Sequence, residues 1–216
     1  MKYLPLIFVF ITQLGHSQDL ALVKSTAQDP AKNIQYHYQW ESTDGHVETV
    51  DLFLLKNHTF EYSIASNVYN VYSTGAWYIS KGVLTLNSDF QKGTLPIKIS
   101  YRQRDSTDNA TKRVAFVKDL NNKPISCAFV YINNDSTKCI FGDLFCNGNY
   151  AQIDSVKVAL ENDGPTSQWM AITPHEGIIQ INIATKLNLE NYVIIKDKRY
   201  RIQENKLHEL SEKSTF

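Results

Sequence analysis

Apolar and polar side chains alternate in short runs along most of this chain. Phe60, Tyr62 and Ile64 fall on one face of such a run, because successive side chains of an extended strand point to opposite sides. Clusters of Gly, Asn, Asp and Ser interrupt the runs at intervals of about eight to twelve residues, the spacing of short antiparallel strands. The pattern predicts an all-β protein.

The first half of the pattern predicts an antiparallel meander, in which each strand pairs with the next. Its expected strands are residues 36–40, 47–55, 59–64, 73–79, 83–87 and 95–102. So few strands cannot enclose a complete cavity, so we expect a half-barrel. Residues 18–33 show no clear period and are expected to form a flexible lead-in.

A stretch without apolar residues, 104–109, separates this half from the rest and predicts a domain boundary. We therefore expect one domain over 34–103 and a second over 111–210. The second domain is expected to contain strands at 113–117, 125–132, 155–160, 168–172, 177–183, 192–196, 200–203 and 206–210, with a loop-rich segment at 133–149.

The first residues have the order of an export signal. Lys2 is followed by an apolar run from Tyr3 to Leu14, and the small residues Gly15 and Ser17 precede the expected cut. The run is too short for a membrane span, which needs about 20 apolar residues. We expect residues 1–17 to be cleaved and the mature protein to be secreted or periplasmic, without membrane insertion.

The charge distribution argues against two classes of partner. Lys and Arg total 22, Asp and Glu total 22, and the basic residues form no cluster. Nucleic acids and anionic membrane surfaces attract dense positive patches. We therefore expect neither as the main partner.

Two parts of the chain resemble known families. In the first half, Trp40 is followed by the phrases Thr59–Tyr62, Gly75–Ile79 and Gly82–Leu86, which contain a Thr-Phe pair, Gly-x-Trp and Leu-x-Leu. These phrases resemble the lipocalin-like meanders of secreted bacterial proteins. The resemblance implies a small antiparallel meander or half-barrel.

The second half resembles the carboxypeptidase regulatory-like domain, an Ig-like or transthyretin-like β-sandwich. The resemblance rests on Val117-x-Asp119 and on the run 122–130, where Pro124 precedes alternating small residues. The chain departs from that family at Cys127, where a small residue, often Gly, is usual. The resemblance implies a non-catalytic accessory or adhesion-type module.

The three cysteines are Cys127, Cys139 and Cys146. Cys127 falls in the apolar phase of an expected strand and is predicted to be a buried thiol. Cys139 and Cys146 flank a loop short enough to close, and an oxidising compartment favours pairing. A disulfide between them and two separate thiols remain alternatives.

Candidate catalytic and metal-binding residues lack the spacing that their chemistry needs. No zinc spacing links the histidines that survive cleavage, which are His37, His46, His58, His175 and His208. The oxygen donors of the loop-rich segment match no calcium loop; they are Asp135, Asp143, Asn147 and Asp154. We therefore expect no catalytic residue, no metal and no cofactor.

Aromatic side chains are the remaining candidates for binding. Tyr69, Tyr72, Trp77 and Tyr78 gather around the loop 67–75, and aromatic faces beside a loop can stack on sugars or contact a protein partner. Core packing is the alternative, and for Trp77 it is the favoured one. We take these four as candidate ligand-binding residues.

The sequence thus predicts a secreted, non-enzymatic binding or accessory protein for a macromolecule or glycan. Two alternatives remain: a lipocalin-type carrier of a small hydrophobic ligand, and an extracellular hydrolase of unfamiliar type. Aromatic side chains inside a closed barrel with an apolar void would favour the carrier. Aromatic side chains on an open face would favour surface binding.

Overall fold

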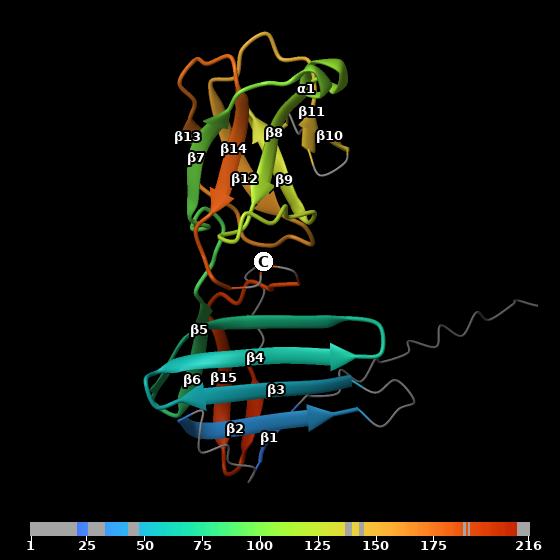
Figure 1. Cartoon of the computed structure of the whole chain (residues 1–216). Helices are drawn as coiled ribbons and strands as arrows, with labels where there is room; N and C mark the ends of the chain where they lie inside the picture. Colours follow the sequence, from blue (N-terminus) through green and yellow to red (C-terminus); the bar gives the residue numbers. More distant parts are fainter. Residues whose placement is uncertain are drawn as a thin grey trace, which may run out of the picture.

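The computed structural model describes residues 21–25, 33–42, 48–136, 140–142, 145–187, 189 and 191–210. Within these ranges the protein consists of strands and one short helix, so the predicted all-β class is confirmed. The strands form two units, an eight-stranded barrel and a unit of two smaller sheets (Figure 1). The expected export signal, residues 1–17, lies outside the described residues.

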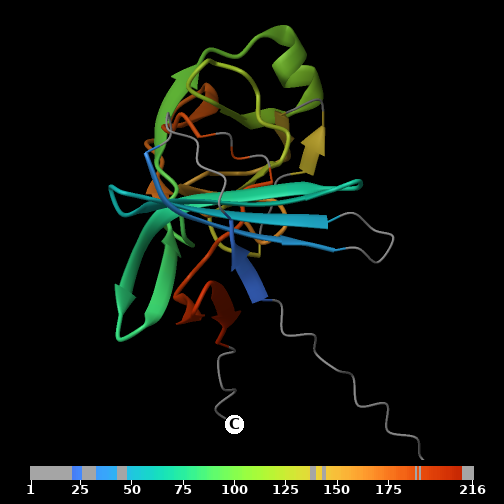
Figure 2. The same cartoon turned by 90° about the horizontal axis from the view of Figure 1, so that it is seen from below.

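The barrel is built from both ends of the described chain. Its strands are β1 (Ala21–Lys24), β2 (Ile34–Glu41), β3 (Glu48–Leu55), β4 (Thr59–Ser66), β5 (Asn70–Ser80), β6 (Val83–Ser88), β15 (Lys198–Gln203) and β16 (Lys206–Glu209). All neighbours are antiparallel, and β1 pairs with both β16 and β2, which closes the ring. In Figures 1 and 2, β2, β3 and β4 cross the direction of β6 and β15 at a steep angle.

Local sequence explains the tight connections of the meander. Lys81 and Gly82 join β5 to β6 with φ values of 50° and 74°. Positive φ at both central residues is the type I′ geometry, which matches the twist of a two-residue hairpin. At Gly75 an added Cβ would lie 2.1 Å from the carbonyl oxygen of Asn87, so β5 and β6 approach closely only because this residue has no side chain.

The strand pairing corrects three expectations. β1 lies in the expected lead-in, and β15 and β16 complete a full barrel where a half-barrel was predicted. The assignment of 200–210 to the second domain was wrong, because those residues pair within the barrel. Alternation shows which side chains share a face of a strand, but the partner strand is selected by packing between distant segments.

The second unit consists of two sheets that share one hydrophobic core. The five-stranded sheet has the order β10 (Ile140–Gly142), β11 (Phe145–Asn147), β8 (Arg113–Lys118), β14 (Ile178–Ile183) and β7 (Ile97–Arg102). The three-stranded sheet has the order β13 (Met170–Ala171), β12 (Ser155–Leu160) and β9 (Ala128–Ile132). Val117 and Ile181 from the first sheet and Val130 and Val158 from the second are all 0% exposed and belong to one cluster.

The polar stretch at 104–109 is not a boundary between the units. It contains most of helix α1 (Ser106–Thr111), whose first turn is capped by Asp105 and Asp108. The two carboxylates accept hydrogen bonds from each other's backbone N–H groups. The polar residues of this segment therefore cap the start of a helix and do not mark a linker between domains. The strand before it, β7, already belongs to the second unit.

The second unit is inserted between β6 and β15 of the barrel. Where the chain leaves and re-enters the barrel, the backbone N–H of Ser88 donates to the carbonyl of Ile195 at 2.8 Å. Inside the second unit, the N–H of Ala184 donates to the carbonyl of Pro96 at 2.9 Å. Each unit therefore brings its own two chain ends together, and two connections join the units (Figure 1).

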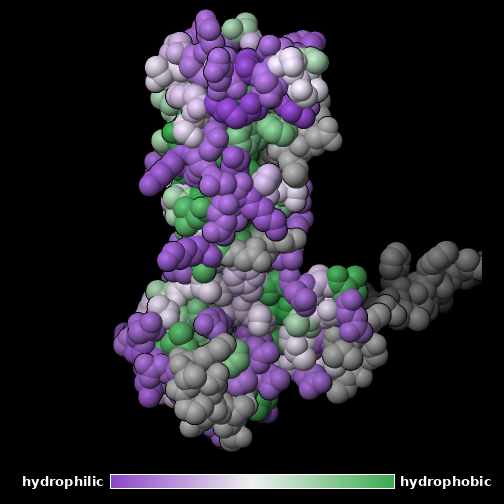
Figure 3. All heavy atoms as spheres, viewed as in Figure 1, coloured by the Kyte–Doolittle hydropathy of each residue, from purple (hydrophilic) through white to green (hydrophobic). Residues whose placement is uncertain are grey.

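Hydrophobic side chains lie mainly inside both units. In the barrel, Leu52, Leu84, Leu86 and Leu207 are 0% exposed. Figure 3 shows mostly hydrophilic residues on the face turned to the viewer, with hydrophobic ones in small scattered groups. Among the described residues, no helix is both long enough and apolar enough to cross a membrane.

Candidate functional site

One end of the barrel interior carries aromatic and charged side chains beside aliphatic ones. Tyr62 of β4 pairs with Leu52 on one side and with Ser73 on the other, so all three point into the barrel. The same inward phase continues towards the β4–β5 turn. We call the following residues the barrel-end cluster: Trp40, Glu48, Tyr62, Ser73, Lys198, Tyr200 and Glu209.

Ser73 is the most unusual member of this cluster. Its side chain is 0% exposed, and its Oγ has no hydrogen-bond partner among the described residues. Leaving a buried hydroxyl without a partner costs about 1–3 kcal/mol. Such groups call for an explanation, such as a bound water molecule, a bound ion or a functional role.

A charged pair lies beside the tyrosine rings of the cluster. Lys198 Nζ is 3.1 Å from Glu209 Oε2, and both side chains are partly exposed. The same ammonium group lies 5.7 Å from the ring centre of Tyr62 and 5.5 Å from that of Tyr200. Tyr200 pairs directly with Glu209 across β15 and β16, which holds these side chains on one face.

Both tyrosine hydroxyls of the cluster are held in the protonated form. Burial, with the nearby carboxylates of Glu209 and Glu48, raises the pKa of Tyr62 to about 12. Burial, followed by Tyr62 and Glu209, also raises the pKa of Tyr200. These phenols can therefore donate hydrogen bonds throughout the neutral pH range.

Tyr69 lies in the turn at the same end of the barrel. Ser66 builds this turn, because its Oγ accepts hydrogen bonds from the N–H groups of Val68 and Tyr69. The Tyr69 side chain is 48% exposed. Desolvation, then the charge of Glu48 and a hydrogen bond to it, raises the pKa of the Tyr69 hydroxyl. Of the four predicted aromatic residues, Tyr69 is the one in contact with the cluster.

The other three predicted residues point in different directions. Trp77 is 5% exposed in the barrel core, and its Nε1–H donates to the carbonyl of Leu55 at 3.1 Å. Tyr78, on the opposite face of β5, is 52% exposed. Tyr72 packs edge-on against Tyr192, with ring centres 5.4 Å apart. The four residues are therefore close in sequence but do not form one surface.

Sequence reasoning missed the charged members of the cluster. Lys198 stands two residues before the buried Tyr200, and Glu209 stands two residues after the buried Leu207. A charged residue in the apolar phase of a strand was the available signal. This signal was overlooked because the alternation over 196–201 equally predicts a strand with one face in solvent.

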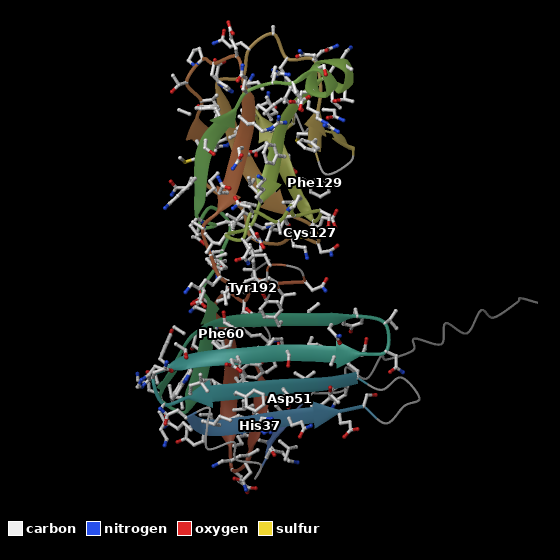
Figure 4. The ribbon with its side chains drawn as sticks, viewed as in Figure 1. His37, Asp51, Phe60, Cys127, Phe129 and Tyr192 are labelled. Carbon is white, nitrogen blue, oxygen red and sulfur yellow. The ribbon has the colours of Figure 1, made fainter. Side chains whose placement is uncertain are left out.

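A histidine and a carboxylate also pair on the outside of the barrel. His37 Nε2 is 2.7 Å from Asp51 Oδ1, and the imidazole stacks on Phe53 with ring centres 4.1 Å apart. Figure 4 shows His37 and Asp51 on neighbouring strands. Within the described ranges, no group of three or more His, Cys, Asp or Glu side chains is placed to hold a metal ion.

The predicted cysteine positions are only partly covered by the structure. Cys139 lies outside the described residues, so its pairing with Cys146 stays a prediction. Cys146 is buried in β11. Cys127 precedes β9 in a turn and is only partly buried, so its expected place in the apolar phase of a strand was wrong.

Comparison with known proteins adds no relative. No family model matches the chain. Neither a curated protein nor a solved structure matches it. The geometry described above is therefore the basis for a functional conclusion.

Proposed function

We propose that this protein is a non-enzymatic binding protein that holds a small ligand at the barrel-end cluster. The observation that carries the proposal is the buried Ser73 hydroxyl, which has no partner among the described residues, beside the aromatic ring of its cross-strand neighbour Tyr62. A ligand that hydrogen-bonds to this hydroxyl removes the cost of burying it. Closed barrels of eight strands are wide enough to hold one small ligand.

The charges of the cluster favour a ligand with a cationic group. Glu48 and Glu209 supply two carboxylates, and Lys198 supplies one ammonium group, which is already paired with Glu209. Glu48 contacts the Tyr69 hydroxyl, and no described cation pairs with it. Aromatic faces also attract cations. The preferred ligand is therefore a small amine or quaternary ammonium compound with an apolar body.

The placement of the aromatic side chains supports the carrier hypothesis more than it supports the use of an exposed aromatic loop. Trp40, Tyr62 and Tyr200 line the inside of a closed barrel, whereas Tyr69, Tyr72 and Tyr78 form no common face. The eight antiparallel strands support a lipocalin-like assignment for the barrel. Two sheets around one core support a transthyretin-like assignment for the inserted unit, as an accessory module. We place the binding activity outside the cytoplasm, following the expected export signal.

Calorimetric titration with benzyltrimethylammonium tests the proposal. The comparison probe is 3-phenylpropionate, which also carries a phenyl ring but has a negative charge. The cation is expected to bind, and Glu48→Gln is expected to weaken its affinity about tenfold, because a charge-assisted contact is lost. Glu41→Gln is the control, since Glu41 is exposed on the outward face of β2. Stronger binding of the anion, or equal loss in both variants, would refute the proposal.

A further inference from the structure

The outer face of the three-stranded sheet carries aromatic side chains. On β9, Ala128, Val130 and Ile132 face the core and are 0% exposed. The two-residue period of a strand therefore turns Phe129 and Tyr131 away from the core, where both are partly buried. Strands of this kind usually show polar residues on their outer face. β9 thus carries apolar or aromatic side chains on both faces, although only one face packs against the core.

The neighbouring strand places a fixed cation and a small side chain against these rings. Lys157 of β12 pairs with Tyr131, and Ala159 pairs with Phe129. Lys157 Nζ lies 5.2 Å from the ring centre of Tyr131 and 5.1 Å from that of Trp169. The same ammonium group forms an ion pair with Asp135. Beside Phe129, the short side chain of Ala159 projects little above the outer face of the sheet.

These residues form the floor of a groove of about 440 Å³. One wall is the turn 161–163, in which Asn162 and Asp163 have φ values of 53° and 60°. Lys92 holds this wall, because its Nζ is 2.7 Å from Asp163 Oδ1 and 2.9 Å from the carbonyl of Gly164. The groove therefore combines an aromatic floor with two ion pairs, Lys92–Asp163 at the wall and Lys157–Asp135 beside the floor.

We propose that this groove binds a neutral oligosaccharide. A sugar ring has an apolar face of C–H groups, which can pack on Phe129 and Tyr131, and an edge of hydroxyls. Each ion pair presents a donor next to an acceptor, which suits neighbouring hydroxyls. An apolar ligand would cover both ion pairs without replacing their contacts with water. The acidic side chains outnumber the basic ones, which disfavours an anionic glycan; the lining acids are Asp135, Glu161 and Asp163, and the bases are Lys92 and Lys157.

The test is calorimetric titration of the full chain with the hexasaccharides of cellulose, amylose, laminarin, xylan, mannan and chitin. We expect at least one to bind, and we expect Phe129→Ala and Tyr131→Ala to weaken that binding about tenfold or more. Tyr131→Phe keeps the ring face and should retain the affinity. Tyr101→Ala is the matched control, because Tyr101 is an exposed tyrosine, at 43%, on the other sheet of the same unit.

Three results would overturn the proposal. They are no binding of any hexasaccharide, binding of polygalacturonate alone, and equal loss of affinity in Tyr101→Ala. The circular-dichroism melting curve of each variant shows whether it is folded, and Tyr131→Phe keeps the test informative if an alanine variant is not. Glu48→Gln in the barrel should leave glycan affinity unchanged, so the groove and the barrel-end cluster can fail separately.

Discussion

The hydroxyl of Tyr192 donates a hydrogen bond to the backbone carbonyl of Thr74, with an O–O distance of 2.9 Å. It also accepts a hydrogen bond from the N–H of Phe90 at 3.3 Å. Thr74 belongs to β5, Phe90 to the segment leaving the barrel, and Tyr192 to the segment returning to it. One side chain, placed between the two units in Figure 4, therefore ties both connections to the barrel wall.

Tyr192→Phe is expected to lower the free energy of unfolding by about 1–2 kcal/mol, because two backbone groups lose a partner in a buried place. Urea denaturation followed by fluorescence measures the change. Tyr101→Phe, at an exposed tyrosine, should have little effect. Equal stability of the two variants would contradict the role assigned to the Tyr192 hydroxyl.

Ser73→Ala should separate stability from binding. Removing a buried hydroxyl that lacks a protein partner is expected to leave the free energy of unfolding unchanged or to raise it by about 1 kcal/mol. The same change should weaken binding of the cationic probe. Thermal melting with and without the probe measures both effects. A clear loss of stability without the probe would show that the hydroxyl has a structural partner.

The tyrosines predict how the protein responds to alkali. Tyr62 and Tyr72 have pKa values raised to about 12 from the ordinary 10.0, and burial is the main cause in each. Because the folded pKa exceeds the unfolded one, this contribution to stability is complete below pH 10 and is lost as the pH rises towards 12. Absorbance at the phenolate band should show these tyrosines ionising late or together with unfolding. Full titration near pH 10 in the folded state would contradict the burial described for them.

Asp108 predicts the response to acid. Its carboxylate is 0% exposed and lies 2.9 Å from Arg102 Nη2. Burial alone would raise its pKa, but hydrogen bonds from Arg102 and from the backbone of Asp105, with the charges of Arg102 and Arg113, lower it below 3.8. Ionised Asp108 thus stabilises the fold above about pH 4, and this contribution disappears as the pH falls further.

Asp108→Asn is expected to cost about 1–3 kcal/mol at neutral pH, because it leaves the partly buried guanidinium groups of Arg102 and Arg113 without their anion. The variant should also lose less stability than the unaltered protein between pH 5 and pH 2, on the scale of ordinary carboxyl titration. Urea midpoints across that range test both statements. Glu176→Gln, at an exposed carboxylate, is the control. If the urea midpoint of Asp108→Asn depends on pH as it does in the unaltered protein, Asp108 does not contribute to the acid response.

The sequence predicted the strands more reliably than their partners. Expected strands at 59–64, 73–79 and 83–87 correspond to β4, β5 and β6, because hydrophobic alternation and turn residues act locally. The expected strand 192–196 forms only an isolated bridge at Tyr192, and its backbone hydrogen bonds to Tyr72 and Ser88 of the barrel do not continue into a ladder. The insertion itself has no local sequence signal, because strand partners more than 100 residues apart share no local pattern, as with Leu86 and Lys198.

The candidate site was predicted only at Tyr69. Aromatic residues near a turn pointed to the correct end of the barrel, but Lys198 and Glu209 reach it from strands that were expected in the other unit. The aromatic pair on β9 could have been found, since Phe129 and Tyr131 occupy the alternate phase of a strand that is already apolar. Neither set can be assembled without knowing which strands are neighbours.

The pairing of Ala21 with His208 fixes the order in which a nascent chain can mature. Six barrel strands are made first, and about a hundred further residues separate them from β15 and β16; synthesis of that stretch takes roughly 5–20 s at typical translation rates. The inserted unit has all its strands before the ring can be sealed, so it can fold first. Until β15 and β16 arrive, β6 and β1 are open edges exposed to pairing with other chains. Chaperone dependence should therefore be greatest in that interval.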